Sequence, residues 1–282
     1  MTDVSIIIPT YNQKLEYLTE CVESALSQYY PKDRYEVLIV DDGSERIQTG
    51  REVYNRFKGY RNLRFIYKGH GGIAHTLNEG IRQMGGEYFK WLSSDDALFS
   101  DALEILMQKA NENTILYGNW MIMDEKSALK TVCFEPLFTD QESFRKALWE
   151  KFIGNATTSL IPRSAFKKVG LFNSSLPSAE DYEWWLRASF LYDYSFINVN
   201  RTVAKYRVHM KQLTTKVFWR HMLLHRQLQL QILEARPSLR SQFKPVSLER
   251  LTKRLFFAKT VQMYKRVGVK SEWFGRLRKL AH

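Results

Sequence analysis

The stretch Glu-Val-Leu-Ile-Val-Asp-Asp-Gly-Ser, residues 36–44, decides the fold. Its aliphatic run 37–40 is bounded by turn-forming residues, which is typical of a strand buried on both faces of a parallel sheet. We therefore expect Asp41 and Asp42 at the carboxyl end of that strand. Asp, Gly and Ser also form ordinary turns and helix N-caps, so this stretch alone leaves a purely structural interpretation open.

Similar strands alternate with helical patterns through the first half of the chain. Strands are predicted at 4–8, 36–40, 63–67 and 87–92. Helices are predicted at 15–27 and 73–84, and another helical stretch follows the second strand and ends near residue 57. Short turns join these segments. Such alternation predicts an α/β fold with a mostly parallel, doubly wound, Rossmann-like sheet and helices on both of its faces.

The alternation weakens after about residue 113. Strands or extended segments are predicted at 115–123, 131–134, 157–161 and 194–207, and helices at 141–151, in a short stretch up to 169, and at 179–192. From residue 217 onward the chain reads as helical and basic, with interruptions at Pro237 and Pro245. This pattern predicts a helical C-terminal extension on the α/β fold.

Composition indicates a globular protein. Hydrophobic residues make up 44% of the 282 residues and aromatic residues 14%, which excludes a disordered chain. No apolar run approaches the roughly 18 residues of a membrane span, and the first residues lack the features of a secretory signal. The spacing of Cys21 and Cys133 suits reduced thiols. We expect a cytoplasmic protein.

The charge of the chain is unevenly distributed. Residues 201–282 contain 20 Lys and Arg against three acids, a net charge of +17; the whole chain carries +12, so residues 1–200 carry −5. A strongly basic tail indicates an anionic partner such as membrane headgroups, nucleic acid or a phosphate-bearing acceptor. A solvated helical face is the equally simple alternative.

Polar and acidic residues follow three of the predicted strands. These groups are Pro9-Thr10-Tyr11-Asn12, Asp41-Asp42-Gly43-Ser44 and Asp95-Asp96. Ligands of open parallel sheets bind outside the carboxyl ends of the strands. Adjacent carboxylates at such ends need a cation or hydrogen-bond donors, and a hard divalent metal that bridges to a diphosphate satisfies them. The pattern therefore favours a nucleotide site with a metal ion.

The ordered set of motifs resembles the family 2 glycosyltransferases of the GT-A fold. The resemblance covers roughly residues 3–215 and rests on Ile6–Asn12, Val40–Ser44, Asn78–Ile81, Gly86–Asp96, Val169–Phe172, Glu180–Arg187 and Tyr206–His209. It implies a GT-A domain over 1–215, with a nucleotide-binding half (1–112) and an acceptor half (113–215), followed by a basic helical extension (216–282).

The resemblance also implies roles for individual residues. The loop formed by Pro9, Thr10 and Tyr11 brackets the nucleobase, usually uracil, and Asp42 accepts a hydrogen bond from it. Further along the donor, Asp95 lies near the ribose and Asp96 binds Mn²⁺ or Mg²⁺. From their own chemistry we add Arg207 as a ligand of the diphosphate and His209 as a ligand of the metal or the phosphate. Asp181 is the implied general base, which takes the proton of the acceptor hydroxyl. Its structural alternative is an acid that favours a helix N-terminus.

Two positions depart from the family pattern. Ser93 stands where many members have an Asp, which leaves fewer protein ligands for a metal. Leu77 stands where an Arg often precedes the Asn of the helix, so cationic help for the diphosphate must come from elsewhere. The candidates are His70, His75, Arg207 and His209.

The resulting hypothesis is an inverting, metal-assisted glycosyltransferase that moves a sugar from a nucleoside diphosphate, usually UDP, to a hydroxyl of a glycan or lipid-linked glycan. Transfer to a polyprenyl phosphate, which needs no base, is one alternative. A non-catalytic sugar-nucleotide or glycan-binding module is another. The tail 216–282 is predicted to dock on the anionic inner face of the membrane, and no recognised motif supports a nucleic-acid partner.

Overall fold

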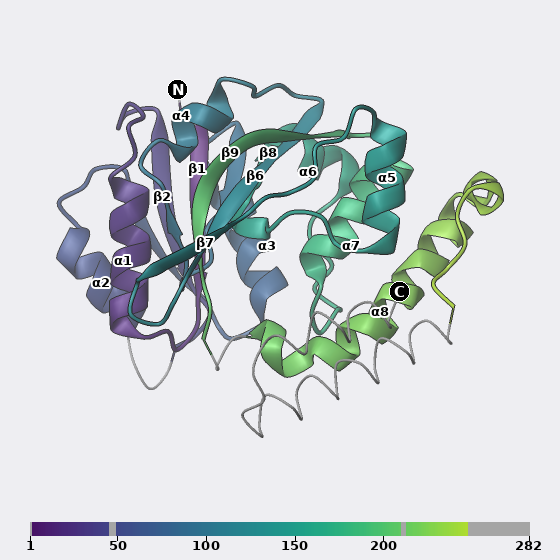
Figure 1. Ribbon diagram of the computed structural model, residues 1–282. Helices are drawn as coiled ribbons and strands as arrows, with labels where there is room; N and C mark the ends of the chain where they lie inside the picture. The colour runs from purple at the N-terminus through teal and green to yellow at the C-terminus, as the bar shows by residue number, and fades with distance from the viewer. Residues whose placement is uncertain (1, 45–48, 210–212, 248–282) are drawn as a thin grey trace. The chain divides into compact units, whose positions relative to one another are not determined.

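The computed structural model describes residues 2–44, 49–209 and 213–247 (Figure 1). The chain divides into two compact units, Met1–Gln212 and Leu213–His282. This division lies close to the predicted boundary between residues 215 and 216. The first unit contains the sheet and all of the predicted site residues.

Four parallel strands form one half of the sheet in the first unit. They are β1 (Val4–Thr10), β2 (Tyr35–Asp41), β3 (Leu63–Tyr67) and β4 (Tyr88–Trp91), in the order β3-β2-β1-β4. Every residue of β1 is buried, as expected for a strand covered on both faces. The predicted doubly wound arrangement is confirmed for this half.

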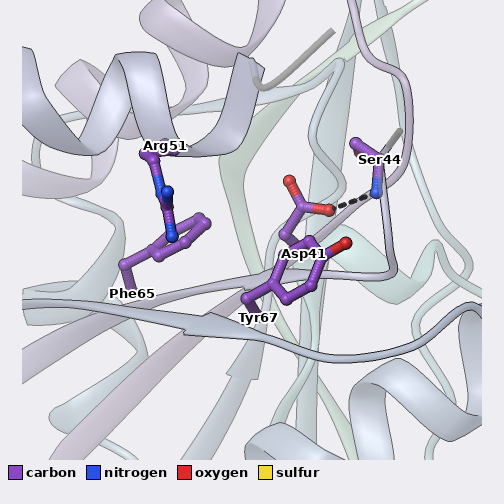
Figure 2. A pocket seen from close by; sticks show the side chains of 5 residues that line it. All are labelled: Asp41, Ser44, Arg51, Phe65 and Tyr67. Carbon is purple, nitrogen blue, oxygen red and sulfur yellow. Dashed lines mark hydrogen bonds between the residues drawn. The ribbon is translucent and has the colours of Figure 1, made fainter. Parts of the chain in front are cut away.

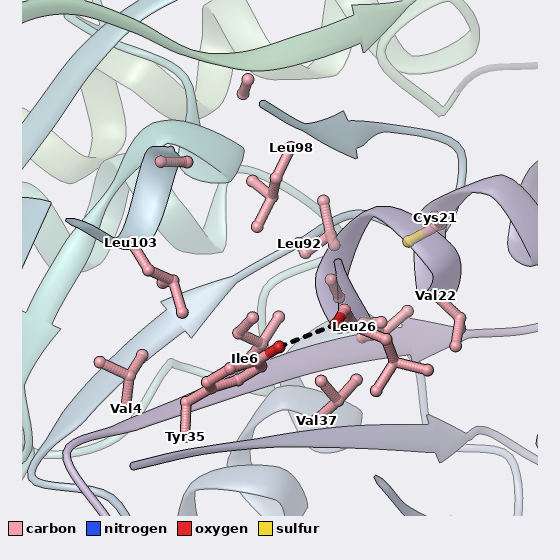
Figure 3. Close-up of a cluster of buried hydrophobic side chains, with 14 of the residues drawn as sticks. Val4, Ile6, Cys21, Val22, Leu26, Tyr35, Val37, Leu92, Leu98 and Leu103 are labelled. Carbon is pink, nitrogen blue, oxygen red and sulfur yellow. Dashed lines mark hydrogen bonds between the residues drawn. The ribbon is translucent and has the colours of Figure 1, made fainter. Parts of the chain in front are cut away.

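Helices cover both faces of this half-sheet. They are α1 (Leu15–Leu26), α2 (Thr49–Phe57), α3 (Ile73–Gln83) and α4 (Ala102–Met107). On one face, Ile6 and Val37 pack with Leu26 of α1 in the main core cluster (Figure 3). On the other face α3 comes so near that a Cβ on Gly80 would lie 2.6 Å from Cγ2 of Ile7. Successive strand residues point to opposite faces, so Ile6 and Ile7 anchor one helix each.

The second half of the sheet is mixed. Its strands are β5 (Ala97–Leu98), β6 (Thr114–Met123), β7 (Leu129–Cys133), β8 (Leu160–Pro162) and β9 (Ser195–Arg207), which continue the order as β4-β8-β6-β9-β5 with β7 beside β6. β8 runs antiparallel to both β4 and β6, whereas β6 and β9 are parallel. The parallel character is therefore concentrated in the first half, and the GT-A fold is confirmed.

Short helices complete the first unit. They are α5 (Gln141–Glu150), η1 (Ala156–Thr158), α6 (Arg163–Val169), α7 (Glu180–Leu186) and a π-helical turn, η2 (Arg187–Leu191). The segment predicted as one helix over 179–192 is therefore an α-helix that continues into a π-turn. Such turns occur frequently near functional sites.

The described part of the second unit is helical. α8 spans Leu213–Ala235 and is followed by η3 (Pro237–Ser241). η3 begins at Pro237 because proline is favoured at the first position of a helix. The amide of Val246 then donates to Oε1 of Gln229 at 2.8 Å. The predicted basic helix beyond residue 247 lies outside the described residues. Among the helices that the structure describes, none has the length and hydropathy of a membrane span.

Candidate active site

The three predicted polar groups meet at one edge of the sheet. Thr10 and Asp41 are register partners at the ends of β1 and β2, and the amide of Asp42 donates to the carbonyl of Thr10 at 2.9 Å. On the other side of β1, the amide of Leu92 donates to the carbonyl of Ile7 at 3.0 Å. The parallel register thus brings the Pro9–Asn12, Asp41–Ser44 and Ser93–Asp96 segments together.

Asp42 is buried and receives hydrogen bonds from a single loop. Its carboxylate accepts from the amides of Gly71 at 2.9 Å and Gly72 at 2.8 Å, pairs with the ammonium of Lys68, and lies 2.9 Å from Nδ1 of His70. Burial alone would raise the pKa of Asp42, but Lys68 and the loop amides outweigh it, so the pKa is lowered. The carboxylate is therefore ionised at neutral pH.

An aromatic stack covers the same place. The rings of Tyr11 and His70 stack with centroids 4.2 Å apart, and about half of Tyr11 is exposed. Gly43 has a φ of +77°, and a Cβ there would lie 2.8 Å from the amide nitrogen of His70. A glycine is thus required for the 68–72 loop to approach Asp42.

Asp41 has a different environment from Asp42. Its Oδ1 accepts from the amide of Ser44 at 2.8 Å, as the turn interpretation of this stretch predicts. Asp41 lines a cavity of about 250 Å³ together with Ser44, Arg51, Phe65 and Tyr67. Figure 2 shows these five side chains.

Asp96 is fully buried, and the protein itself engages both of its carboxylate oxygens. Oδ2 accepts from Oγ1 of Thr157 at 2.6 Å, and Oδ1 accepts from the amide of Arg207 at 2.9 Å. Burial, followed by the charge of Asp95, raises the pKa of Asp96 well above its usual range. These two contacts join η1 to β9 through Asp96, and its predicted role as a metal ligand stays a prediction.

Asp95 is the acid that lies beside His209. Its Oδ2 is 2.9 Å from Nε2 of His209, and the two side chains are 20% and 9% exposed. Two ligands in adjacent corners of an octahedron, each about 2.1 Å from a metal, are about 3.0 Å apart. The pair therefore fits one edge of such a site. In the described residues no group of three or more His, Cys, Asp or Glu fits a metal, so further ligands have to come from the donor or from water.

Arg207 is also fully buried, and protein groups hold its guanidinium. Nε donates to the carbonyl of Asp95 at 2.8 Å, and Nη1 donates to Oγ of Ser127 at 3.1 Å. It forms an ion pair with Glu20 and lies 4.2 Å from the ring centroid of Tyr17. Protein groups thus hold Arg207 in a structural position, and its predicted contact with phosphate stays a prediction. It joins α1 and the β6–β7 hairpin to the acid pair.

Sequence reasoning missed Lys14, an exposed cation near the same pair. Nζ of Lys14 lies 3.1 Å from the hydroxyl of Tyr17 and 4.5 Å from its ring centroid. The ring of Tyr17 in turn lies 5.6 Å from that of His209, and the side chain of Lys14 is 45% exposed. The available signal was its place two residues after Asn12, the last residue of the Pro9–Asn12 loop.

Asp181 lies at the start of α7, after Ala179 in the left-handed region at φ 63°. Its Oδ1 accepts from the amide of Tyr182 at 2.7 Å. Burial raises the pKa of Asp181 to about 6, although this amide lowers it. Burial and the charge of Asp181 raise the pKa of Glu180 to about 8. A weakly acidic carboxyl of this kind suits general-base chemistry.

The remaining motifs hold α7 in place. Nε1 of Trp184 donates to the carbonyl of Gly170 at 2.8 Å, and Arg187 donates to the carbonyl of Leu171 at 2.8 Å. The side-chain amide of Asn78 exchanges two hydrogen bonds with the backbone of Phe172. Trp184 and Trp185 are both buried, so these motif residues support the helix that carries Asp181.

Comparisons with known proteins identify relatives of this chain. Residues 5–170 match the model of Glycosyl transferase family 2. An uncharacterized glycosyltransferase of Rickettsia felis is 34% identical over 227 residues, which cover 76% of this chain and 35% of the relative. Glycosyltransferase GlyG of Streptococcus pneumoniae is 31% identical over 181 residues, which cover 60% of this chain and 58% of the relative.

A solved structure has the same fold. The crystal structure of Staphylococcus aureus TarS 1–349 in complex with UDP-GlcNAc superposes on this chain with a TM-score of 0.62 and 18% sequence identity. The match covers 96% of this chain and 77% of the TarS chain. The chain spans about a third of the length of the Rickettsia felis relative. The fold, the matched residues and the relatives lead to one conclusion: the chain belongs to glycosyl transferase family 2.

Proposed function

We propose that the chain is the catalytic part of an inverting glycosyltransferase that moves a sugar from a nucleoside diphosphate, UDP in the first instance, to a hydroxyl of a glycan or lipid-linked glycan. The observation that carries this proposal is the Asp95–His209 pair, 2.9 Å apart, at the sheet edge that also holds Tyr11 and Asp42. The family supports sugar transfer, and the UDP-GlcNAc complex of TarS supports the choice of nucleotide.

The base and ribose bind at the ends of β1 and β2. Tyr11 stacks on the base, and Asp42, ionised at neutral pH, accepts the N–H of uracil. Oγ1 of Thr10 is buried and has no hydrogen-bond partner among the described residues, which supports a ligand contact beside Pro9. Because loop amides already hold Asp42, base binding includes a rearrangement of residues 68–72.

The diphosphate lies beside Asp95 and His209. We assign these two residues, in place of Asp96, as the ones that would hold Mn²⁺ or Mg²⁺. A bound cation would neutralise negative charge on the departing nucleoside diphosphate. Lys14 adds a second positive charge at this place, the contribution first expected from Arg207. The three named side chains thus orient the leaving group.

The acceptor reacts at Asp181. As its hydroxyl oxygen attacks the anomeric carbon from the face opposite the diphosphate, Asp181 takes the hydroxyl proton. The bond from the anomeric carbon to the phosphate oxygen breaks, and its electron pair leaves with the diphosphate. One displacement inverts the anomeric configuration. With a pKa of about 6, Asp181 is mostly ionised at pH 7 and is a stronger base than an ordinary Asp.

The test is a transfer assay with UDP-sugars and Mn²⁺ or Mg²⁺, on the wild type, Asp95→Asn and Asp181→Asn. Hydroxyl transfer predicts that both variants lose activity and that Asp181→Asn still binds the nucleotide. Full activity of Asp181→Asn would favour a polyprenyl phosphate acceptor, which needs no base. Nucleotide binding without transfer or hydrolysis by the wild type, with any donor, would favour the non-catalytic module.

The basic tail carries a separate proposal, in which it holds a cytoplasmic enzyme at the inner face of the membrane. Its support is the net charge of +17 over residues 201–282. Flotation with liposomes of anionic and of neutral lipid, with the full chain and with residues 1–215, tests it. Binding of only the full chain to only the anionic liposomes is expected, and equal flotation of both proteins contradicts it.

A further inference from the structure

Lys90 is a fully buried lysine in β4, at the centre of the sheet. It pairs in register with Ile6 of β1 and Leu160 of β8. Its ammonium donates to the carbonyl of Thr157 and, at 3.1 Å, to that of Trp91. Lysine is almost never fully buried unless it is paired. An aliphatic residue would fill this place in the sheet without the cost of desolvating a charge, so the lysine requires an explanation.

A continuous path of hydrogen bonds leads from Lys90 to the Asp95–His209 pair. Thr157, whose carbonyl accepts from Lys90, donates through Oγ1 to Oδ2 of Asp96 at 2.6 Å. Oδ1 of Asp96 accepts from the amide of Arg207 at 2.9 Å. Nε of Arg207 then donates to the carbonyl of Asp95 at 2.8 Å, and Oδ2 of Asp95 lies 2.9 Å from His209. Each step joins elements that are far apart in sequence.

Lys90 and Asp96 also interact through their charges. Burial lowers the pKa of Lys90 to about 7, and the negative charge of Asp96 opposes this effect. The ammonium also fixes η1, the turn that carries Thr157, against the end of β4. A turn fixed in this way holds Asp96 in one orientation.

We propose that Lys90 is a positioning residue, which holds the Asp95–His209 pair in its metal-binding geometry through Thr157 and Asp96. The inference rests on the proposed function, because the pair is assigned there to the cation. Partners in the outer shell of a metal site typically change metal affinity or activity 10- to 100-fold when they are mutated. In this role Lys90 acts through Thr157 and Asp96 and does not itself bind the donor or the metal.

The experiment measures Mn²⁺ affinity of the full chain by electron paramagnetic resonance, with and without UDP. The variants are Lys90→Met, which removes the charge, Lys90→Gln, which keeps an N–H donor, and Thr157→Val, which removes only the hydroxyl. Val37→Ala is the matched control, since Val37 is fully buried in β2 and lies outside the path. Thermal unfolding of every variant separates a general loss of stability from a loss of metal affinity.

The expected result is a 10- to 100-fold weaker Mn²⁺ affinity for Lys90→Met and Thr157→Val, an intermediate loss for Lys90→Gln, and none for Val37→Ala at a comparable loss of stability. Wild-type affinity in the folded Lys90 variants overturns the inference. If both Lys90 variants fail to fold, wild-type affinity in Thr157→Val overturns it. Absence of Mn²⁺ binding by the wild type itself, with UDP present, contradicts the proposed metal site instead.

Discussion

Asp181→Asn is expected to stabilise the protein at neutral pH while it abolishes transfer. The carboxyl has a pKa of about 6 in the folded protein and about 3.8 as an ordinary Asp. Burial therefore disfavours its charged form, and the folded state binds the proton more tightly than the unfolded state does. The stability contributed by this proton is fully present below pH 3.8 and is lost as the pH rises through 6.

The size of the effect follows from these two values. At about 1.4 kcal/mol per pKa unit, the raised pKa of Asp181 lowers the free energy of unfolding, relative to that of a protein with a neutral side chain here. The loss is about 3 kcal/mol at pH 7.5 and about 1 kcal/mol at pH 4.5. Asn has no charge to desolvate, and its side-chain oxygen can still accept from the amide of Tyr182. The free energy of unfolding of the variant should therefore exceed that of the wild type by up to about 3 kcal/mol at pH 7.5. At pH 4.5 this gain should be roughly 2 kcal/mol smaller.

The assay is urea unfolding of the wild type and the variant at both pH values. Asp140→Asn is the control, because Asp140 accepts from the amide of Ser143 and its pKa is lowered. The Asp140 carboxylate stabilises the folded state above the pKa that Asp140 has in the unfolded chain, and this stability is lost as the pH falls. The variant Asp140→Asn should therefore be less stable than the wild type at pH 7.5. An equal gain for Asp181→Asn at pH 4.5 and 7.5 would refute the raised pKa.

Four further predictions concern the donor side. His209→Ala should lower the Mn²⁺-dependent transfer rate at least about 100-fold, measured over a range of Mn²⁺ concentrations. Lys14→Gln should raise the KM for the donor about tenfold with kcat nearly unchanged, because a charge-assisted contact with the diphosphate is lost; exposed Lys146→Gln is the control. Arg207→Met should lose about 3–5 kcal/mol in urea unfolding, because it leaves Glu20 and its other partners without the guanidinium. Gly43→Ala should weaken UDP binding in calorimetry, because φ +77° and the 2.8 Å approach of His70 both exclude a Cβ.

The sequence was sufficient to predict the strand ends that meet at the site. Apolar runs, and the polar or acidic residues after them, indicate where β1, β2 and β4 end, and a parallel sheet brings those ends to one edge. These are local properties of the chain. The predicted strands at 4–8, 36–40 and 63–67 accordingly lie within the observed β1, β2 and β3.

The sequence could not show which acid of the adjacent pair is fully buried. Asp95 and Asp96 are neighbours, but only Asp96 meets Thr157 and the amide of Arg207, which are 61 and 111 residues away. Such contacts depend on the packing of the mixed half of the sheet, where the alternating pattern is weak. The burial of Arg207 and Lys90 has the same origin, since charge in a sequence normally indicates exposure.

The contacts of Arg207 have a consequence for dissection of the protein. Its guanidinium pairs with Glu20 of α1 and donates to the β6–β7 hairpin, while β8 joins β4 to β6 within one sheet. A cut between residues 112 and 113 would expose the edge of β4 and separate a buried cation from its anion. The nucleotide-binding and acceptor halves are therefore expected to unfold in one cooperative transition, and neither half should be stable when expressed alone.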